Sequence, residues 1–237
     1  HYFVEGNLSG SCSRCNTSLS TVSMLYGFRC HYCEEKFCPE CLTSSIMNEP
    51  CNLGRFSKIK FSPTQVIASD RLSPLSWTVQ IRPNFEPLLV FINKRSGGQV
   101  GATIIPRMGW YLNPCQIFDL GNGGPLPAIK LMKRMGITSY KALACGGDGT
   151  AAWVMSALDK HALKHPSAFI PPLAVLPLGT GNDLARSLGW GGGYDDNAID
   201  GILEKVMRGV VTQLDRWTLE LTPSSGGDTQ KKIINNY

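Results

Sequence analysis

The chain has 237 residues, of which 43% are hydrophobic and 17% charged, which is typical of a globular rather than a disordered protein. No uninterrupted apolar run approaches the roughly 18 residues that span a bilayer, and no basic stripe with interleaved aromatic residues indicates nucleic-acid binding. The net charge of +5 suits a nucleotide or an anionic membrane surface without requiring either. The length allows two domains, and because the chain opens inside a motif, with His1, we expect a piece of a longer protein.

Seven of the nine cysteines lie in the first 51 residues, and six of them form C-x-x-C pairs. The pairs are Cys12 and Cys15, Cys30 and Cys33, and Cys38 and Cys41, with His1 before them and Cys51 after them. Each pair places two thiolates on one tight turn, within reach of one tetrahedral zinc ion. The alternative is a disulfide framework, but the odd cysteine count and the repeated two-residue gap favour zinc. Eight ligands predict two zinc sites.

Residues 52–86 contain several prolines and serines and predict a connector, with one strand near Trp77–Ile81. A connector of this length is expected to pack on the domain that follows it.

Residues 88–101 read LLVFINKRSGGQVG and predict a buried strand at 88–92, a polar loop and a helix from about 101 to 112 that contains Pro106. Lys94 and Arg95 are either phosphate ligands or solvated loop charges. Further along, the sequence predicts a strand at 115–120 and a helix at 127–135.

Residues 141–163, KALACGGDGTAAWVMSALDKHAL, predict a buried strand, a glycine turn and a helix that starts near Thr150. Trp153, Val154, Leu158 and Leu163 are expected near one face of this helix. Glycines let the backbone approach an anion, and the free N–H groups of a helix start favour it. The structural alternative is a plain βα turn in which Asp148 or Thr150 caps the helix.

Residues 173–186, LAVLPLGTGNDLAR, repeat the plan of strand, glycine turn and helix start. If the strands are parallel, all three loops lie at the carboxyl edge of one sheet, where open α/β sheets bind ligands. The sequence therefore predicts one phosphate cleft rather than three unrelated turns.

The remaining residues predict an amphipathic helix at 198–208, a strand at 213–221 and a hairpin that ends at Tyr237. Cys115 and Cys145 are expected to be buried thiols rather than ligands. His161 and His165 are expected to be exposed side chains at a helix end.

The motifs NKRSGG, GGDGT and PLGTGNDLAR, in this order, resemble the catalytic domain of the diacylglycerol kinases. GGDGT alone resembles a signature that is also found in sphingosine, ceramide and NAD kinases. The continuations LARSLGWGGGYDD and DRWTLEL are similar to diacylglycerol kinases in particular. The resemblance covers about residues 87–237 and implies a three-layer α/β fold with a mostly parallel sheet. It also implies transfer of the γ-phosphoryl group of ATP, with Mg²⁺, to diacylglycerol.

The resemblance and the chemistry of each side chain place candidate nucleotide-binding residues in all three loops: Asn93, Lys94, Arg95, Ser96, Gly97, Gly146, Gly147, Gly149, Thr150, Gly179, Thr180, Gly181, Asn182 and Asp183. Thr180 and Asn182 would hydrogen-bond the nucleotide. Asp148 is the catalytic candidate, acting through Mg²⁺, which favours carboxylates, or orienting the loop. Asp183 contacts the nucleotide or caps the following helix.

The order of ligands in the first 51 residues resembles the cysteine-rich phorbol-ester/diacylglycerol zinc finger. By position, the resemblance puts one zinc on His1, Cys30, Cys33 and Cys51 and the other on Cys12, Cys15, Cys38 and Cys41. Cys38 stands where that family usually has histidine, and thiolate is an acceptable replacement. Tyr26 precedes Gly27 where lipid-binding members have glutamine, and no proline precedes Cys12. We therefore expect weak or no diacylglycerol binding by this finger.

The expected domains are a finger (1–51), a connector (52–86), an ATP-binding lobe (87–222) and the start of a second, β-rich lobe (223–237). Because that second lobe carries the catalytic base in the family, we expect the base to lie beyond Tyr237.

The expected partners are ATP and diacylglycerol at a membrane surface, with no nucleic acid, in a cytoplasmic, peripherally membrane-associated protein. The alternatives are a sphingoid-base or ceramide kinase and a catalytically inactive zinc-finger module.

Overall fold

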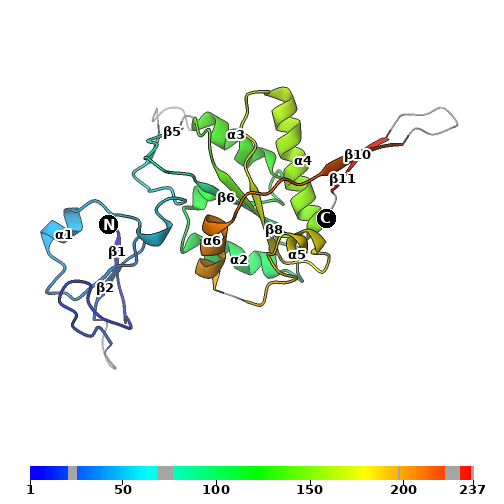
Figure 1. The fold of residues 1–237 in the computed structure, drawn as a ribbon. Coiled ribbons are helices and arrows are strands. Elements are labelled where there is room, and N and C mark those ends of the chain that lie inside the picture. Colours follow the sequence, from blue (N-terminus) through cyan, green and yellow to red (C-terminus); the bar gives the residue numbers. More distant parts are fainter. Residues whose placement is uncertain (21–25, 69–76, 197, 222–229, 236–237) are drawn as a thin grey trace.

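The computed structural model describes residues 1–20, 26–68, 77–196, 198–221 and 230–235. A small finger at the N-terminal end is followed by a connector and a larger α/β domain, as Figure 1 shows. The larger domain has a four-stranded sheet whose neighbouring strands are all parallel. The predicted fold class is therefore confirmed. No helix among the described residues is both long enough and apolar enough to cross a membrane.

The finger is a three-stranded antiparallel sheet with one short helix. Its elements are β1 (Phe3–Glu5), β2 (Phe28–Cys30), β3 (Lys36–Phe37) and α1 (Ser44–Asn48). Leu19, Phe37 and Ile46 form a small apolar cluster, in which the other buried members are Cys12 and Cys38. Such a small core cannot by itself stabilise an independent fold.

The α/β domain alternates strands and helices around the parallel sheet. Its elements are β6 (Leu88–Ile92), α2 (Val100–Gly109), η2 (Pro114–Gln116), β7 (Ile117–Asp119), α3 (Leu126–Arg134), β8 (Lys141–Gly146), α4 (Asp148–Lys164), β9 (Leu173–Pro177), α5 (Asp183–Ser187) and α6 (Ile199–Arg208). The strand order is β7-β6-β8-β9. All five residues of β6 are buried, as expected for a parallel strand that is covered on both faces.

Two hydrophobic cores lie on opposite faces of this sheet, which gives three layers. Leu89 and Phe91 pack with residues of α3 and α4 in one core. Val90 and Ile92 pack with residues of α2 and α6 in the other. Successive side chains of β6 thus alternate between the two faces, with the period of two that a strand imposes. Figure 1 shows the two pairs of helices on opposite sides of the sheet.

The connector packs on the α/β domain, as expected from its length. Phe56, in η1 (Gly54–Phe56), joins one core and Phe61 the other. The buried Gln116 side chain fixes the connector to β6, because it donates to the carbonyl of Leu88 at 2.8 Å and accepts from the N–H of Phe61 at 2.9 Å. Within the connector, β4 (Val66–Ala68) pairs with β5 (Trp77–Val79), near the single strand that the sequence predicts.

The connector also meets the finger. The buried Lys60 ammonium donates to the carbonyl of Tyr32 at 2.9 Å. On the surface, Arg55 bonds to Asp200 at 2.7 Å and to Glu204 at 3.0 Å, both on α6. Buried apolar contacts and surface ion pairs therefore both join the connector to its neighbours.

Three expectations about the α/β elements are wrong in detail. The predicted helix at 101–112 ends at Gly109, with Pro106 inside it, and the predicted strand at 115–120 is a 3₁₀ turn followed by three strand residues. Trp153 and Leu163 are 46% and 82% exposed, because only the stripe of α4 that contains Val154 faces the sheet.

The predicted C-terminal hairpin is present as β10 (Arg216–Leu221) paired with β11 (Gln230–Asn235), while its turn and Tyr237 lie outside the described residues.

Candidate metal sites and a glycine-lined sheet edge

The cysteines of the finger gather with His1 into two groups of four. One group is His1, Cys30, Cys33 and Cys51, and the other is Cys12, Cys15, Cys38 and Cys41. Within each group all ligand atoms lie within 4.8 Å of one another. These are the two sets that the finger resemblance implies.

The geometry of each group suits tetrahedral zinc. Four ligands at about 2.3 Å from one ion lie roughly 3.8 Å from one another. The Sγ atoms of Cys15 and Cys38 are 3.7 Å apart, and those of Cys30 and Cys51 are 3.9 Å apart. All nine cysteines are free thiols, so the disulfide alternative is wrong for this structure. The two groups could therefore each hold a zinc ion.

The backbone around Cys12 favours the thiolate form that binds metal. Burial acts to raise the pKa of Cys12, but the backbone N–H groups of Cys15, Cys38 and Arg14 outweigh it and lower the pKa to about 6. In the other group, the Cys33 thiol lowers the pKa of Cys30 to about 4 despite its burial.

The three glycine loops meet at the carboxyl edge of the sheet. Ile92 pairs with both Asp119 and Cys145, and Cys145 pairs with Leu176, so the four strands end at one level. The chain goes from β6 to β7 on one side and then to β8 on the other. Such a reversal of direction is the point at which open α/β sheets bind ligands. The prediction that the loops share one edge is confirmed.

Glycine is required where these loops touch. Gly97 has a φ of +61°, and a Cβ there would overlap the carbonyl oxygen of Leu178. Gly179 sits so close to the second loop that its Cβ would fall 3.1 Å from the Cα of Gly147. The first and third loops are linked to the second by further bonds: the Asn93 amide donates to the Thr150 hydroxyl at 3.2 Å, and the N–H of Leu178 donates to the carbonyl of Gly146 at 3.1 Å. These contacts make the three loops one packed unit.

The Asp148 carboxylate holds the start of α5. One oxygen accepts from the N–H of Asp183 at 2.9 Å and the other from the N–H of Leu184 at 3.2 Å. These bonds satisfy two of the free donors that every helix start exposes. The expectation that Asp148 or Thr150 caps its own helix is wrong, because Gly147 occupies that position without a side-chain bond. Of the two roles expected for Asp148, this geometry is the loop-orienting one.

Asn182 and Asp183 both bond within the third loop and the helix that follows it. Asn182 is 1% exposed, and its amide donates to the carbonyls of Gly179 and Gly192, which closes the third loop onto the following turn. Among the described residues, its buried Oδ1 has no hydrogen-bond partner. Asp183 does not cap α5, since its carboxylate pairs with Arg186 at 2.8 Å while Asp148 performs the capping.

The remaining candidate nucleotide-binding residues differ in their exposure to solvent. Residues that face solvent at this edge are Lys94, Arg95, Gly149, Thr180, Gly181 and Asp183. Ser96 is half-buried and Thr150 is buried. The exposed group offers two cations, a hydroxyl and backbone N–H groups, which together can bind phosphate.

Sequence reasoning missed Asp119 at this edge. Lys94 pairs with Asp119 at 2.8 Å, and the Asp119 side chain is only 14% exposed. Burial acts to raise the pKa of Asp119, but Lys94 and the N–H of Gly121 outweigh it and hold the pKa below its usual range. The available signal was a carboxylate two residues before Gly121, near the end of a predicted strand.

A cysteine-rich finger and a parallel α/β domain with three glycine loops at its carboxyl edge define a two-part protein with a candidate phosphate-binding site. Residues 87–217 match the family model described as the diacylglycerol kinase catalytic domain. The chain therefore belongs to the diacylglycerol kinase family, and the resemblance in its loop motifs is confirmed.

Curated relatives match across the whole chain. Diacylglycerol kinase zeta of Rattus norvegicus is 36% identical over 284 aligned residues, covering 100% of this chain and 30% of the relative. Diacylglycerol kinase 1 of Drosophila melanogaster is 36% identical, covering 99% of this chain and 20% of the relative. Diacylglycerol kinase iota of Homo sapiens is 34% identical, and the alignment covers 100% of this chain and 26% of the relative. The chain thus spans less than a third of the length of these relatives. No solved structure matches it.

Proposed function

We propose that this chain is the finger and ATP-binding lobe of a lipid kinase that transfers the γ-phosphoryl group of ATP to the hydroxyl of diacylglycerol, giving phosphatidic acid. The observation that carries the proposal is the packing of three glycine loops into one unit at the carboxyl edge of β6, β8 and β9. Membership of the diacylglycerol kinase family supports the choice of substrate.

The residues at the edge suit the triphosphate of ATP. Gly146, Gly147 and Gly149 would let the backbone approach phosphate oxygens, and the exposed Gly149 would offer its N–H at the start of α4. Lys94, Arg95 and Thr180 are exposed beside them and would contact the phosphates or the sugar. Mg²⁺ bound with ATP would supply charge neutralisation for the transferring group.

In this proposal Asp148 acts mainly by positioning. Its two bonds to α5 set the third loop, and with it Gly179 to Gly181, against the second loop. The protein would act from the cytoplasm at a membrane surface, with two structural zinc ions in the finger.

The experiment is a kinase assay on the full-length protein with ATP, Mg²⁺ and a panel of diacylglycerol, sphingosine and ceramide. The proposal expects diacylglycerol to be phosphorylated well above the other lipids. Preference for sphingosine or ceramide, or ATP binding without turnover of any of the three, would reject it.

Variants at Asp148 separate its two roles. Asp148→Ala removes both bonds to α5 and is expected to abolish most turnover and to destabilise the domain by about 1–3 kcal/mol, the cost of leaving such donors unpaired. Asp148→Asn keeps one acceptor oxygen and the side-chain shape, so a positioning role predicts partial activity. Loss of all turnover in a fully stable Asn variant would instead assign the carboxylate to the metal.

A further inference from the structure

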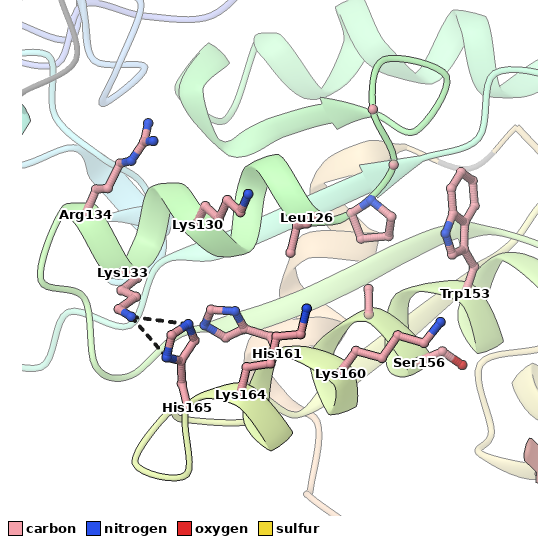
Figure 2. A pocket seen from close by; sticks show the side chains of 14 residues that line it. Leu126, Lys130, Lys133, Arg134, Trp153, Ser156, Lys160, His161, Lys164 and His165 are labelled. Atoms are coloured by element: carbon pink, nitrogen blue, oxygen red, sulfur yellow. Dashed lines mark hydrogen bonds between the residues drawn. The ribbon is translucent and has the colours of Figure 1, made fainter.

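A groove between α3 and α4 shares no lining residue with the three glycine loops and has no role in the proposed reaction. It has a volume of about 750 Å³, within the range of sites that hold small ligands. Figure 2 shows basic side chains from both helices along its length, with Trp153 toward one end and Leu126 near the middle. The basic residues that line it are Lys130, Lys133, Arg134, Lys160 and Lys164, together with His161 and His165.

The positive charge of the groove is not balanced locally. No aspartate or glutamate is among its lining residues. None of the five lysine and arginine side chains forms an ion pair with any acidic residue in the described parts of the chain. The Lys133 ammonium instead lies 3.3 Å from a ring nitrogen of His165, whose ring contacts that of His161 at a tilted angle. Burial lowers the pKa of His161, and the nearby His165, Lys133 and Lys130 lower it further.

Helix-end electrostatics explain only part of this cluster. Lys133, Arg134 and Lys164 lie in the last turns of their helices, where cations are favoured. Lys130 and Lys160 lie a turn or more earlier, on the same two faces, and gain little from the helix ends. A ligand that carries negative charge would account for their position.

The apolar residues of the groove indicate an amphiphilic ligand. The Trp153 indole is 46% exposed although it packs against the backbone, since a Cβ on Gly124 would fall 2.8 Å from the ring. Leu126, which also lines the groove, is 40% exposed. Exposed tryptophan and leucine beside lysine and arginine are typical of side chains that sit at a bilayer interface. A soluble anion such as free phosphate would make no use of them.

We propose that the α3–α4 groove is a docking surface for anionic phospholipid headgroups at a membrane. Lys130, Lys133, Lys160 and Lys164 contact the phosphates, while Trp153 and Leu126 enter the interface. The surface contains none of the proposed ATP-binding residues, so its occupation does not depend on the proposed reaction.

The test compares two double variants of the full chain in sedimentation with phosphatidylcholine vesicles, with and without phosphatidylserine. Each lysine near an anionic surface contributes about fivefold to partitioning. Lys130→Gln with Lys160→Gln is therefore expected to weaken binding to the phosphatidylserine vesicles by roughly 20-fold. Lys58→Gln with Lys205→Gln is the matched control, because both lysines are exposed elsewhere and the net charge changes equally. The control is expected to bind like the unaltered chain.

A fluorescence measurement and a competition experiment complete the test. Tryptophan emission of the unaltered chain should shift to the blue on phosphatidylserine vesicles, and Trp153→Phe should remove much of that shift. Equal weakening by both double variants would show nonspecific attraction and overturn the proposal. If the chain bound polyglutamate tightly and phosphatidylserine vesicles did not displace it, the partner would be an acidic polypeptide. That result would overturn the proposal.

Discussion

The finger and the α/β domain differ in the interactions that stabilise each of them. The apolar cluster of the finger has five buried members, and two of these are cysteines of a candidate metal site. The sheet of the α/β domain is covered on both faces by large cores that take in every residue of β6. We therefore expect the finger to depend on metal bonds for its fold, whereas the α/β domain depends on buried apolar surface. The same residue type illustrates the difference, because Cys30 is a candidate ligand and Cys145 is an apolar core residue whose burial raises the pKa of its thiol.

Chelation of zinc is expected to give the largest effect and to act on the finger alone. Structural zinc contributes on the order of 10 kcal/mol to folding of such modules, more than the finger core can replace. Metal analysis should find two zinc ions per chain. Addition of a strong chelator should then abolish hydrogen-exchange protection in residues 1–51 while the β6 and β8 amides stay protected.

Cysteine variants provide the control for this prediction. Cys33→Ala should lower the zinc content to about one ion per chain, whereas Cys145→Ala should leave it at two. Folded protein without zinc, or disulfides among the finger cysteines, would contradict the account.

Phe91→Ala is expected to destabilise the α/β domain and to leave the finger unaffected. Phe91 is fully buried in the core beneath α3 and α4, so the cavity should destabilise the α/β domain by about 3–5 kcal/mol. Zinc content should not change. The measurement is chemical denaturation followed at the α/β domain, alongside metal analysis. Loss of zinc together with the core would show that the two parts fold as one cooperative unit.

Arg55→Ala, at the junction of the regions, should have the smallest effect. Arg55 joins the connector to Asp200 and Glu204, but its side chain is 44% exposed. Surface ion pairs contribute about 0–1 kcal/mol, so a double-mutant cycle with Asp200→Ala should return a coupling in that range. A coupling of several kcal/mol would mean that this surface contact holds the regions together.

Patterns that repeat along the chain predicted most of the fold. The paired cysteines indicated two metal sites, and the finger resemblance indicated how the ligands divide between them. Apolar runs followed by glycine turns indicated the parallel strands and their shared edge. Ile199, Ile202, Leu203 and Val206 are buried as the amphipathic pattern of 198–208 predicts. The position of a motif on an element was therefore predictable from local sequence.

The sequence did not predict contacts between segments that lie far apart in the chain. Asp148 caps a helix that begins 35 residues later, and Lys94 pairs with Asp119 on a neighbouring strand. The face that α4 turns to the sheet also depends on its packing, which is why Trp153 lies outside the core. The basic residues of the α3–α4 groove lie on two helices, and only the fold brings them together.

Hydrogen exchange with and without Mg-ATP tests the central claim most directly, because it locates the nucleotide without relying on turnover. We predict added protection in residues 93–101, 146–151 and 178–184 together, with little change in the finger or in the α3–α4 groove. Protection confined to one loop, or centred on the groove, would contradict the conclusion that the three glycine loops form a single nucleotide site.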